Sequence, residues 1–463
     1  MKLKLFFNCA KKSRVLMCIF FVSLFSGCLF GGEISIKSVS TAALQQSIEL
    51  KKKQKRLDIQ TTEIKAAWAE NFPKLDSQYT LNYADYSISG RDALANIVVG
   101  ETPISVYPVR PSRYKSSFDT TLTQILYSGG KISANITLNK LQYEQEKIDY
   151  LLLKESVLTT SLEAFWQYYL AFQEKQYYQF CLASLALKKQ NSDLKKWQGL
   201  TTQYQDMELA LAALNTQEDS EKSRLQCQTK LAELQSIIHL DLETVKPNVF
   251  MQTGTQLELV WTQLKTVVSD EDLELDRQKV EIQIRQQNQI IEDSRFLPEV
   301  FFQGGINYFN LDDDHMDKAA GNLKYGSLYS GITVKWNWFN GFKDKARSEK
   351  AALEKEVADL DLSQKQRDKQ VVLEQLSHHV AIALTNMKRT EKSLQLARQL
   401  LADKEQLKEA GKLSVEDVFE SQELFKKSEL NFERSIVEVE LAMLKWCQKT
   451  HRVDDYIVLK GVL

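Results

Sequence analysis

The residues whose types could bind a metal ion lie mainly in one acidic segment, Asp312-Asp313-Asp314-His315 followed by Asp317. Dense carboxylates attract divalent cations, but this spacing does not match a calcium-binding loop, so a solvated acidic loop is the simpler interpretation. The other histidines have no carboxylate or serine at a spacing useful for catalysis, and we find no phosphate loop, nucleophile elbow or Cys/His zinc pattern. The sequence therefore predicts a protein that is not an enzyme and that needs no metal or cofactor.

The first 32 residues have the pattern of an export signal. Basic residues precede an apolar run, Val15 to Phe25, which is too short to span a bilayer as a helix. Cys28 ends the segment Leu24-Phe25-Ser26-Gly27-Cys28, which resembles a bacterial lipobox, where the cysteine is acylated and becomes the mature N-terminus. Phe25 stands where leucine is more usual, and simple signal cleavage near Gly32 is the alternative.

Composition excludes some classes of protein. The chain of 463 residues has a formal net charge of −1, so it resembles neither a basic nucleic-acid binder nor an acidic tail protein. Beyond the signal segment three cysteines remain, at Cys181, Cys227 and Cys447. An odd number on separate predicted helices argues against a disulfide framework and favours buried thiols.

The chain repeats itself. Gly129 and Gly199 are each matched 212 residues later, by Gly341 and Gly411, with similar sequence patterns around the first glycine of each pair. An internal repeat of this length sets the organisation of the fold. The pattern of each half predicts a helix that ends near a proline, followed by a strand, a loop and a second strand. A helix of about 70 residues, a tight turn and a returning helix are expected after the second strand. In the first half, the helix before the strand is expected at Thr41–Phe72 and the returning helix at Gln203–Leu240.

The predicted strands alternate between apolar and polar residues, which is typical of half-buried strands. In Tyr114–Tyr127, Leu122 and Leu126 are expected on one face, and the same alternation is expected in Val300–Tyr308 and Leu328–Trp338. Aromatic residues near the strand ends also suit the wall of a membrane barrel. Alternation alone supports a membrane wall and a sheet on a soluble core equally. An exported chain with membrane-type strands and no apolar helix points to an outer membrane.

The long helix of each half is the more decisive element. After Gly130, the stretch to Trp197 contains neither glycine nor proline, and 70 helical residues span roughly 105 Å, far more than a compact domain. The returning helix of the second half carries two apolar seams, one of which includes Val418, Phe425 and Glu429 at heptad spacing. Two seams on one helix indicate neighbours on two sides.

Two strands per half make four strands, and four strands cannot close a membrane barrel. A sheet in lipid has no open edge, and the smallest membrane barrels have about eight strands. Partners must supply the rest, most simply other copies of the chain. Two copies would give eight strands and a plugged interior, and three would give twelve and a lumen.

This doubled architecture, with its Tyr-Ser-Gly-Gly and Phe-Asn-Gly-Phe strand exits and its turns at Gly199 and Gly411, resembles the outer membrane efflux protein family (TolC-like). The resemblance covers nearly the whole mature chain and implies a mainly α fold with a small β part. It implies a homotrimer with a twelve-stranded β-barrel in outer-membrane lipid, a long periplasmic α-barrel and an equatorial region. It further implies a channel for drug, metal or protein efflux that works with a periplasmic adaptor and an inner-membrane pump of RND, ABC or MFS type.

These patterns divide the chain into a signal segment at 1–32, a first repeat at 33–240 and a second repeat at 269–450. The resemblance implies that the remaining parts, a linker at 241–268 and a C-terminal segment at 451–463, belong to the equatorial region.

In the family, acidic residues after the tip glycine constrict the closed periplasmic entrance. Asp417 and Glu420 match these positions, with Glu416 beside them, whereas in the first repeat Gln205 replaces the aspartate and only Asp206 and Glu208 are acidic. Tripled around an axis, such residues form negative rings that favour cations and can hold the entrance shut. Acidic residues at a helix start also favour the helix dipole, and Ser414 at that start is a suitable N-cap.

The hairpin tips are the expected docking sites for the adaptor. They comprise Gly199, Leu200 and Thr201 in the first repeat, and Gly411, Leu413 and Ser414 in the second.

Two other functions compete with a passive export duct. One is a surface-exposed structural or adhesive coiled-coil protein without a pore, which would have no reason to place strand–loop–strand at the same point of both repeats. The other is a periplasmic adaptor, which carries one helical hairpin rather than two.

Overall fold

The computed structural model describes residues 33–84, 95–99, 102–106, 113–197, 203–238, 246–248, 254–266, 272–321 and 323–462. Cys28 and the tip residues Gly199, Leu200 and Thr201 lie outside the described residues. The chain is mainly helical with a small antiparallel sheet. It forms two compact units, which we call unit 1 (Met1–Ser47, Glu155–Val268 and Gln375–Leu463) and unit 2 (Ile48–Lys154 and Ser269–Glu374). These units cut across the repeats, so the division by repeat remains a prediction about sequence.

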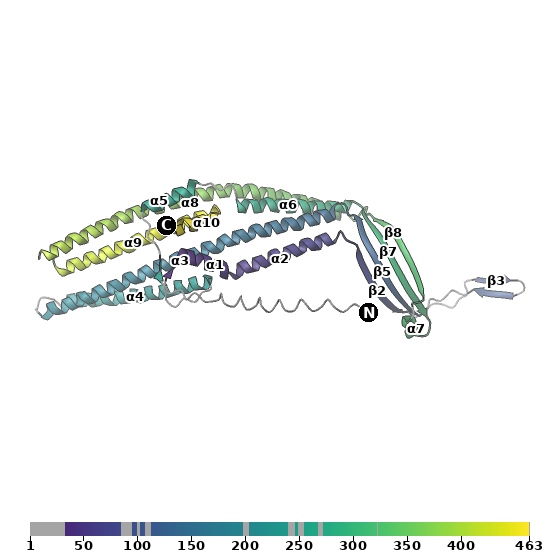
Figure 1. The fold of residues 1–463 in the computed structure, drawn as a ribbon, viewed down its shortest axis with the longest axis horizontal. Helices are drawn as coiled ribbons and strands as arrows, with labels where there is room; N and C mark the ends of the chain where they lie inside the picture. Colours follow the sequence, from purple (N-terminus) through teal and green to yellow (C-terminus); the bar gives the residue numbers. More distant parts are fainter. Residues whose placement is uncertain are drawn as a thin grey trace, which may run out of the picture. The chain divides into compact units, whose positions relative to one another are not determined.

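The helices follow the predicted order in both halves (Figure 1). The two long helices, α3 and α8, each contain 67 residues, close to the expected 70. The helical elements are α1 (Ile36–Gln46), α2 (Ile48–Ala69), α3 (Lys131–Trp197), α4 (Gln203–Ile238), α5 (Gly254–Thr266), α6 (Leu273–Asp293), η1 (Ser294–Phe296), α7 (Met316–Gly321), α8 (Lys343–Glu409), α9 (Val415–Lys449) and α10 (Val453–Val462).

The single helix predicted at Thr41–Phe72 is wrong in its bounds. Two helices, α1 and α2, meet at Ser47, whose ψ of 115° is not helical. Serine competes with the helix through its own hydroxyl and tolerates such a break. The second helix ends at Ala69, four residues before Pro73, because Glu70 and Asn71 donate to carbonyls only three residues back, at Ala67 and Trp68.

The two hairpins form one antiparallel sheet in unit 2, in the order β2 (Lys74–Tyr83), β5 (Tyr114–Tyr127), β7 (Glu299–Asp312) and β8 (Tyr325–Lys335). The strands of the two repeats are therefore neighbours, joined through β5 and β7 (Figure 1). Within the described residues, β2 and β8 are each paired on one side only. The backbone groups on their outer sides are available to a further strand.

The register gathers the apolar residues of all four strands on one face. A row such as Tyr79, Phe118, Tyr308 and Gly326 crosses the sheet with every side chain on the same side. The apolar face contains Leu75, Leu81, Phe118, Leu122, Phe302, Ile306, Tyr308, Leu328, Ile332 and Val334. The opposite face is largely polar and contains Asp76, Gln78, Asn82, Asp119, Thr121, Thr123, Gln303, Asn307, Ser327 and Thr333.

Two details of the strands differ from the sequence prediction. A register shift between Ile125 and Tyr127 places Tyr127 opposite Val300, so the alternation predicted to include Leu126 breaks at a β-bulge. The last strand ends at Lys335, and Trp336 and Trp338, predicted within it, follow it instead.

Two glycines allow tyrosine rings to lie flat on the sheet. A Cβ at Gly305 would lie 2.6 Å from the hydroxyl oxygen of Tyr329, and one at Gly326 would lie 2.7 Å from the ring of Tyr308. Each tyrosine faces its glycine across a strand pair. This packing covers the glycine and favours the observed register over a slipped one.

The structure adds elements that the sequence analysis treated as loops. A separate hairpin, β3 (Ala95–Val99) and β4 (Thr102–Val106), lies in the first loop, and α7 lies in the second (Figure 1). The short helix α7 is held against the sheet because Asn310 Nδ2 donates to the Lys318 carbonyl at 2.8 Å and the Ser116 hydroxyl bonds the carbonyl of Ala319. In unit 1, β1 (Glu33–Ile34) pairs in parallel with β6 (Lys246–Pro247).

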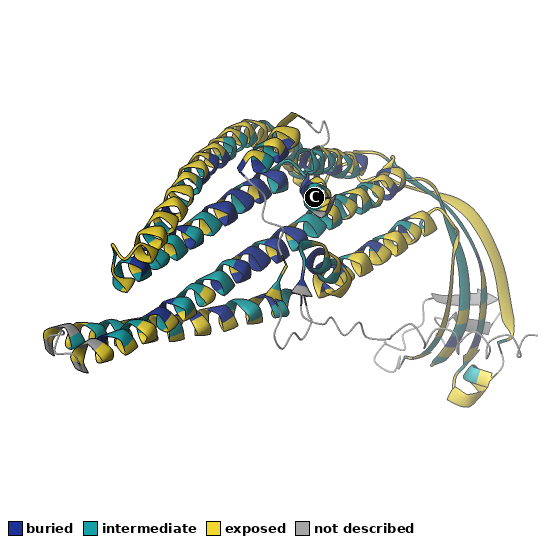
Figure 2. Ribbon diagram, turned by 60° about the vertical axis from the view of Figure 1, so that its left-hand side comes forward, coloured by how far each residue is buried: buried dark blue, intermediate teal, exposed yellow. Residues whose placement is uncertain are grey.

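Unit 1 holds most of the described hydrophobic core. One cluster joins α3, α5, α8, α9 and α10, and a second joins α1, α3 and α4 with Val437 of α9. Figure 2 shows the buried residues gathered along the inner stretches of these helices. Cys181, Cys227 and Cys447 are buried free thiols, as the sequence predicts.

A buried polar network fixes α10 in this core. Lys460 and Glu440 form an ion pair with side chains only 4% and 2% exposed. Tyr456 donates to the same carboxylate at 2.8 Å and accepts a hydrogen bond from Trp166 Nε1 at 3.2 Å. Both charges are thus compensated, which a buried ion pair requires.

We expect Lys460→Met to destabilise the protein by about 3–5 kcal/mol, because it leaves the Glu440 carboxylate buried without its cation. Thermal unfolding in detergent measures the change. The exposed Lys445→Met on α9 is the matched control and should have little effect. Adding Glu440→Gln to Lys460→Met should recover much of the loss, and a double variant as unstable as the single one would contradict this account.

Candidate functional site

The second hairpin tip joins α8 to α9 through a glycine turn. Gly411 has a φ of +71°, and Lys412 N–H donates to the Leu407 carbonyl at 2.9 Å. A left-handed residue just after a helix end favours glycine, which has no Cβ to clash. The turn continues through Leu413 to Ser414, which is the N-cap residue of α9.

Asp417 is part of the start of α9. The Ser414 hydroxyl accepts a hydrogen bond from Asp417 N–H at 3.2 Å, and the Asp417 carboxylate accepts from Ser414 N–H at 3.2 Å, which makes a capping box. Hydrogen bonds from Ser414 hold the pKa of the Asp417 carboxyl below its ordinary value. Asp417 is therefore anionic at neutral pH and held at the tip by these hydrogen bonds. Glu416 beside it is half-buried, and Glu420, about one helical turn further along α9, is exposed.

The first tip uses its acidic residue differently. Asp206 forms an ion pair with Lys196 and accepts a hydrogen bond from the Ser192 hydroxyl at 3.1 Å. The bond from Lys196 lowers the pKa of the Asp206 carboxyl and offsets its charge. Glu208, further along α4, accepts a hydrogen bond from the Tyr204 hydroxyl, which raises the pKa of Tyr204. The structure thus ties Asp206 into the packing of α3 on α4.

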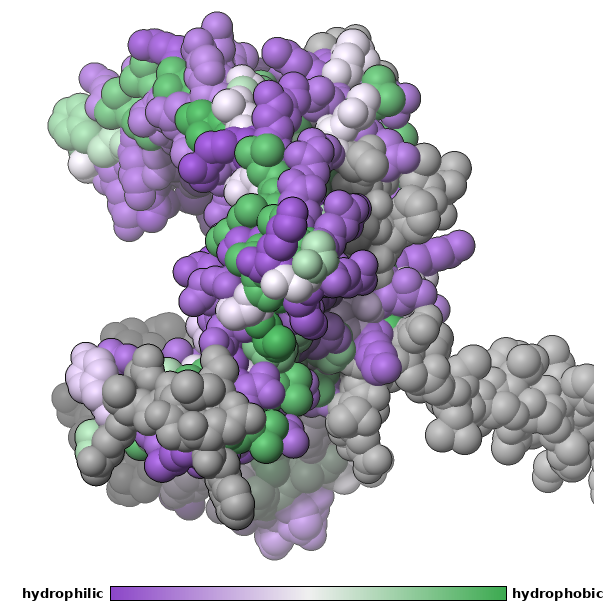
Figure 3. Space-filling view, turned by 90° about the vertical axis from the view of Figure 1, so that its left-hand side faces the viewer, coloured by the Kyte–Doolittle hydropathy of each residue, from purple (hydrophilic) through white to green (hydrophobic). Residues whose placement is uncertain are grey.

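The two hairpins of unit 1 contact each other through α3 and α9. Lys188 of α3 pairs with Glu423 of α9 at 3.2 Å, and Arg434 of α9 pairs with Glu174 of α3 at 2.8 Å. Figure 3 views the hairpin ends, where hydrophilic side chains predominate and hydrophobic ones are scattered among them. Ion pairs therefore supply part of the contact between the helices that carry the tips.

A small cavity of about 230 Å³ lies between α3 and α9 at this contact. Glu433 faces it, and burial together with the neighbouring Glu429 raises its pKa to about 7. Its lining residues are Gln173, Gln176, Tyr177, Phe180, Lys426, Glu429, Leu430 and Glu433. The sequence analysis did not single out this site, although the charged Glu429 in a mostly apolar heptad seam was the available signal.

The sheet of unit 2 is the second candidate site, because its two faces differ in chemistry. On the apolar face, Leu328 is 81% exposed, Leu75 67% and Ile332 68%, because none of the described residues covers these side chains. On the polar face, Asp119 accepts from Asn307, and Thr121 and Tyr329 bond through their hydroxyls at 3.0 Å. Figure 2 shows β8 exposed along its whole length.

Aromatic residues cluster where β8 ends. Trp336 and Trp338 stack with their ring centroids 4.1 Å apart, and Trp336 Nε1 donates to the Phe296 carbonyl at 3.0 Å. Trp338 is 80% exposed, and the nearby Phe339 and Phe342 are exposed as well. Exposed tryptophans with a polar handle at one end of an apolar sheet face suit a boundary between apolar and aqueous surroundings.

The acidic loop after β7 forms a turn. The Asp312 carboxylate accepts from the backbone N–H groups of Asp314 and His315 at 3.0 and 2.9 Å, which lowers its pKa. In the part of the chain that the structure describes, no group of three or more acidic, histidine or cysteine side chains has a geometry that holds a metal ion.

Among the described helices, none has a stretch long and apolar enough to cross a bilayer.

The fold is that of TolC-like outer membrane efflux channels, as the sequence predicts. The Campylobacter jejuni CmeC outer membrane channel aligns with a TM-score of 0.66 and 14% identity, covering 90% of this chain and 86% of that one. The outer membrane protein VceC of Vibrio cholerae aligns with a TM-score of 0.66 and 12% identity, covering 90% and 95%. The open state of the Neisseria gonorrhoeae MtrE outer membrane channel aligns with a TM-score of 0.67 and 10% identity, covering 90% and 89%.

By sequence, neither a family model nor a curated protein matches the chain.

The raised pKa of Glu433 makes stability depend on pH. The folded protein binds a proton at this carboxyl more tightly than the unfolded chain, so the free energy of unfolding should fall as pH rises from about 4.5 through about 7. Glu433→Gln should remove this fall and stabilise the protein at pH 8 by on the order of 1–2 kcal/mol.

Melting temperatures in detergent at pH 5 and pH 8 measure the effect. Glu438→Gln, an exposed change on the same helix, is the control and should keep the native pH dependence. If the Glu433→Gln protein loses as much stability between the two pH values as the native protein, the carboxyl is not the cause.

Proposed function

We propose that this chain is the outer-membrane channel component of a tripartite export system, a passive duct that hydrolyses nothing itself. The single observation that carries the proposal is the four-stranded sheet of unit 2, apolar on one face and polar on the other, with two edges to which no described strand is paired. The likeness of the fold to outer membrane channels supports it.

Three copies would complete the sheet. The strands alternate in direction, so β8 of one copy and β2 of the next would pair antiparallel, and three copies give a twelve-stranded barrel. The apolar face would contact outer-membrane lipid and the polar face would line the lumen. The trimer is also the smallest assembly that leaves an open lumen, since eight strands have a filled interior.

The partners would be those of such a system. A periplasmic adaptor would dock at the tips, with Gly411, Leu413 and Ser414 presented by the α8–α9 turn, and an inner-membrane pump would supply the energy and select the exported compound. Acylation of Cys28 would anchor the N-terminus to the same membrane. Nucleic acid has no place in this function, in keeping with the net charge of −1.

The tips would close the periplasmic entrance. Asp417 and Glu420, with Glu416, would supply the negative ring of the second hairpin, whereas Asp206 is already paired with Lys196. Glu208 is the remaining acidic candidate on the first hairpin. The gate would therefore rest mainly on α9.

The competing proposal is a surface-exposed structural or adhesive coiled-coil protein without a pore. Purification from membranes, a measurement of oligomer mass and single-channel recording in planar bilayers separate the two. We expect a trimer that conducts ions. A water-soluble monomer without conductance would exclude the duct.

For the gate, we expect Asp417→Ala combined with Glu420→Ala to raise the resting conductance, because it removes the charges that bind cations and hold the tips together. Asp417 also caps α9, so the matched control is Ser414→Ala, which breaks the capping box and keeps both carboxylates. Conductance unchanged in the double variant, or raised equally by Ser414→Ala, would rule out an acidic gate.

A further inference from the structure

The short helix α7 lies against the sheet of unit 2, where side chains from three strands donate hydrogen bonds to its backbone carbonyls. The donors are Asn310 of β7, Ser116 of β5 and Tyr79 of β2, and the acceptors are the carbonyls of Lys318, Ala319 and Ala320. Ala319 is fully buried in this contact. The helix is therefore fixed to the sheet and does not project away from it.

All three donors stand on the apolar face of the sheet. Ser116 lies two residues before Phe118 on β5, and Tyr79 is the cross-strand partner of Phe118. Asn310 lies two residues after Tyr308 on β7. Residues two apart on a strand point to the same side. The helix α7 therefore covers part of the apolar face, at the end of the sheet away from the long helices (Figure 1).

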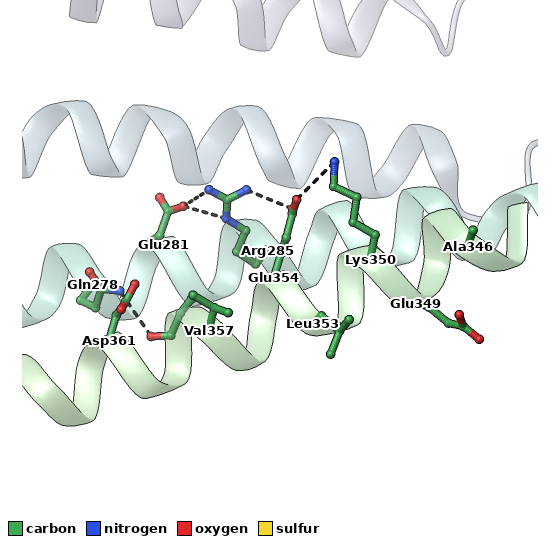
Figure 4. Close-up of a pocket in the computed structure, with 11 residues that line it drawn as sticks. Gln278, Glu281, Arg285, Ala346, Glu349, Lys350, Leu353, Glu354, Val357 and Asp361 are labelled. Carbon is green, nitrogen blue, oxygen red and sulfur yellow. Dashed lines mark hydrogen bonds and ion pairs between the residues drawn. The ribbon is translucent and has the colours of Figure 1, made fainter. Parts of the chain in front are cut away.

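The stacked Trp336 and Trp338 mark the opposite end of this apolar face. Beyond them the chain enters α8, and charged side chains line a groove of about 550 Å³ between α6 and α8. Figure 4 shows Arg285 of α6 between Glu281 and Glu354, with ion pairs to both. Charged side chains are costly in hydrocarbon, so the apolar band ends near the tryptophans.

The distance from α7 to the tryptophans matches the apolar core of a bilayer. Asn310 and Val300 lie ten residues apart on β7, and Val300 pairs with Val334, two residues before Trp336. Ten strand residues span about 33 Å, and a barrel tilt of about 40° reduces their height to about 25 Å. The lipid-facing band of outer-membrane barrels has a height of about 25 Å. The helix α7 thus lies where the outer edge of the hydrocarbon would be.

The surface of α7 has the mixed chemistry of that edge. Met316 is 53% exposed, and Asp317 and Lys318 beside it are exposed as well. At the same end of the apolar face, Tyr83 and Tyr114 pack with ring centroids 5.2 Å apart. Tyrosine is enriched where acyl chains meet headgroups, because its ring is apolar and its hydroxyl is polar. An exposed apolar side chain beside charged ones suits the same boundary.

We propose that α7 is an outer-leaflet anchor, which lies between acyl chains and headgroups with Met316 in contact with the acyl chains, and which sets the depth of the channel in the membrane. The inference rests on the proposed function, because it takes the apolar face as the lipid-facing one. Lipid is the occupant and not a second copy, since α7 is bonded to the central strands β5 and β7, whereas copies would join at β2 and β8.

Depth-dependent fluorescence quenching tests the anchor in the full-length protein in phospholipid vesicles. A dye on Met316→Cys should be quenched more by lipids brominated near the headgroup than by lipids brominated near the chain end. A dye on Leu328→Cys, near the middle of the apolar face, should show the reverse order. A dye on Ser327→Cys, its neighbour on the polar face, is the matched control and should be quenched by neither. The described native cysteines are buried, and the unmodified protein gives the background labelling.

The outcomes separate the anchor from the duct. Quenching of the Met316 dye mainly from the headgroup region supports the anchor. If that dye is quenched no more than the Ser327 dye, or mainly from the chain ends, while the Leu328 dye is quenched, the anchor is overturned and the duct is not. If the Leu328 dye is not quenched either, the apolar face does not meet lipid, and the proposed function is overturned as well.

The donors on the sheet allow a second test. Asn310→Ala with Ser116→Ala removes the two buried side chains that bond α7, so a dye on Met316→Cys should lose its quenching by headgroup-brominated lipids. Asn307→Ala, which changes an asparagine of the same strand on the polar face, is the matched control and should leave the quenching unchanged. Oligomer mass shows whether the variants assemble. Full quenching in an assembled double variant would overturn the role of these contacts in placing α7.

Discussion

The backbone groups along the outer sides of β2 and β8 impose the constraint on which the rest of unit 2 depends. In an apolar environment each unpaired N–H or C=O costs several kcal/mol. A sheet with one apolar face is therefore not stable there until both edge strands are hydrogen-bonded to further strands. The helices follow the same order, because cross-helix contacts place them as α2, α3, α6 and α8, with α2 and α8 at the ends. Among the described residues, an edge strand and an end helix thus lie on each side of unit 2.

The two units are held together by different kinds of contact. Unit 1 buries large side chains such as Trp166, Phe165 and Tyr456 among five or more helices. The described part of unit 2 has a single small cluster, Ala67, Ile132 and Ile136, and its helices are joined mainly by ion pairs and amide hydrogen bonds. Unit 2 therefore depends less on a buried apolar interior than unit 1 does.

Periodicity in the sequence predicted the mainly helical fold with its small antiparallel sheet. The repeated glycines, the absence of helix breakers after Gly130 and the alternation in Tyr114–Tyr127 gave the element order, the strand faces and helices close to their observed lengths. The local geometry of individual elements could not be predicted from this periodicity. The break at Ser47 and the bulge before Tyr127 depend on single backbone angles and pairings, and α7 is held by contacts from distant residues, Ser116 and Asn310.

At the hairpin tips, the sequence indicated acidic residues and a helix cap, but not which partner each acidic residue would take. Asp206 is paired by Lys196 ten residues earlier, and Glu433 owes its raised pKa to burial against α3, neither of which a one-dimensional pattern reveals.

The hydrogen bond from Trp166 to Tyr456 joins positions 290 residues apart, and unit 1 is assembled from three stretches of chain between which the whole of unit 2 is inserted. Contacts so distant in sequence form slowly, because a very long loop must close before they contribute any stabilisation. During synthesis from the N-terminus, the core of unit 1 cannot be completed until α10 has emerged. Until then the apolar side chains that α10 covers stay exposed, and the incomplete core must be shielded from aggregation.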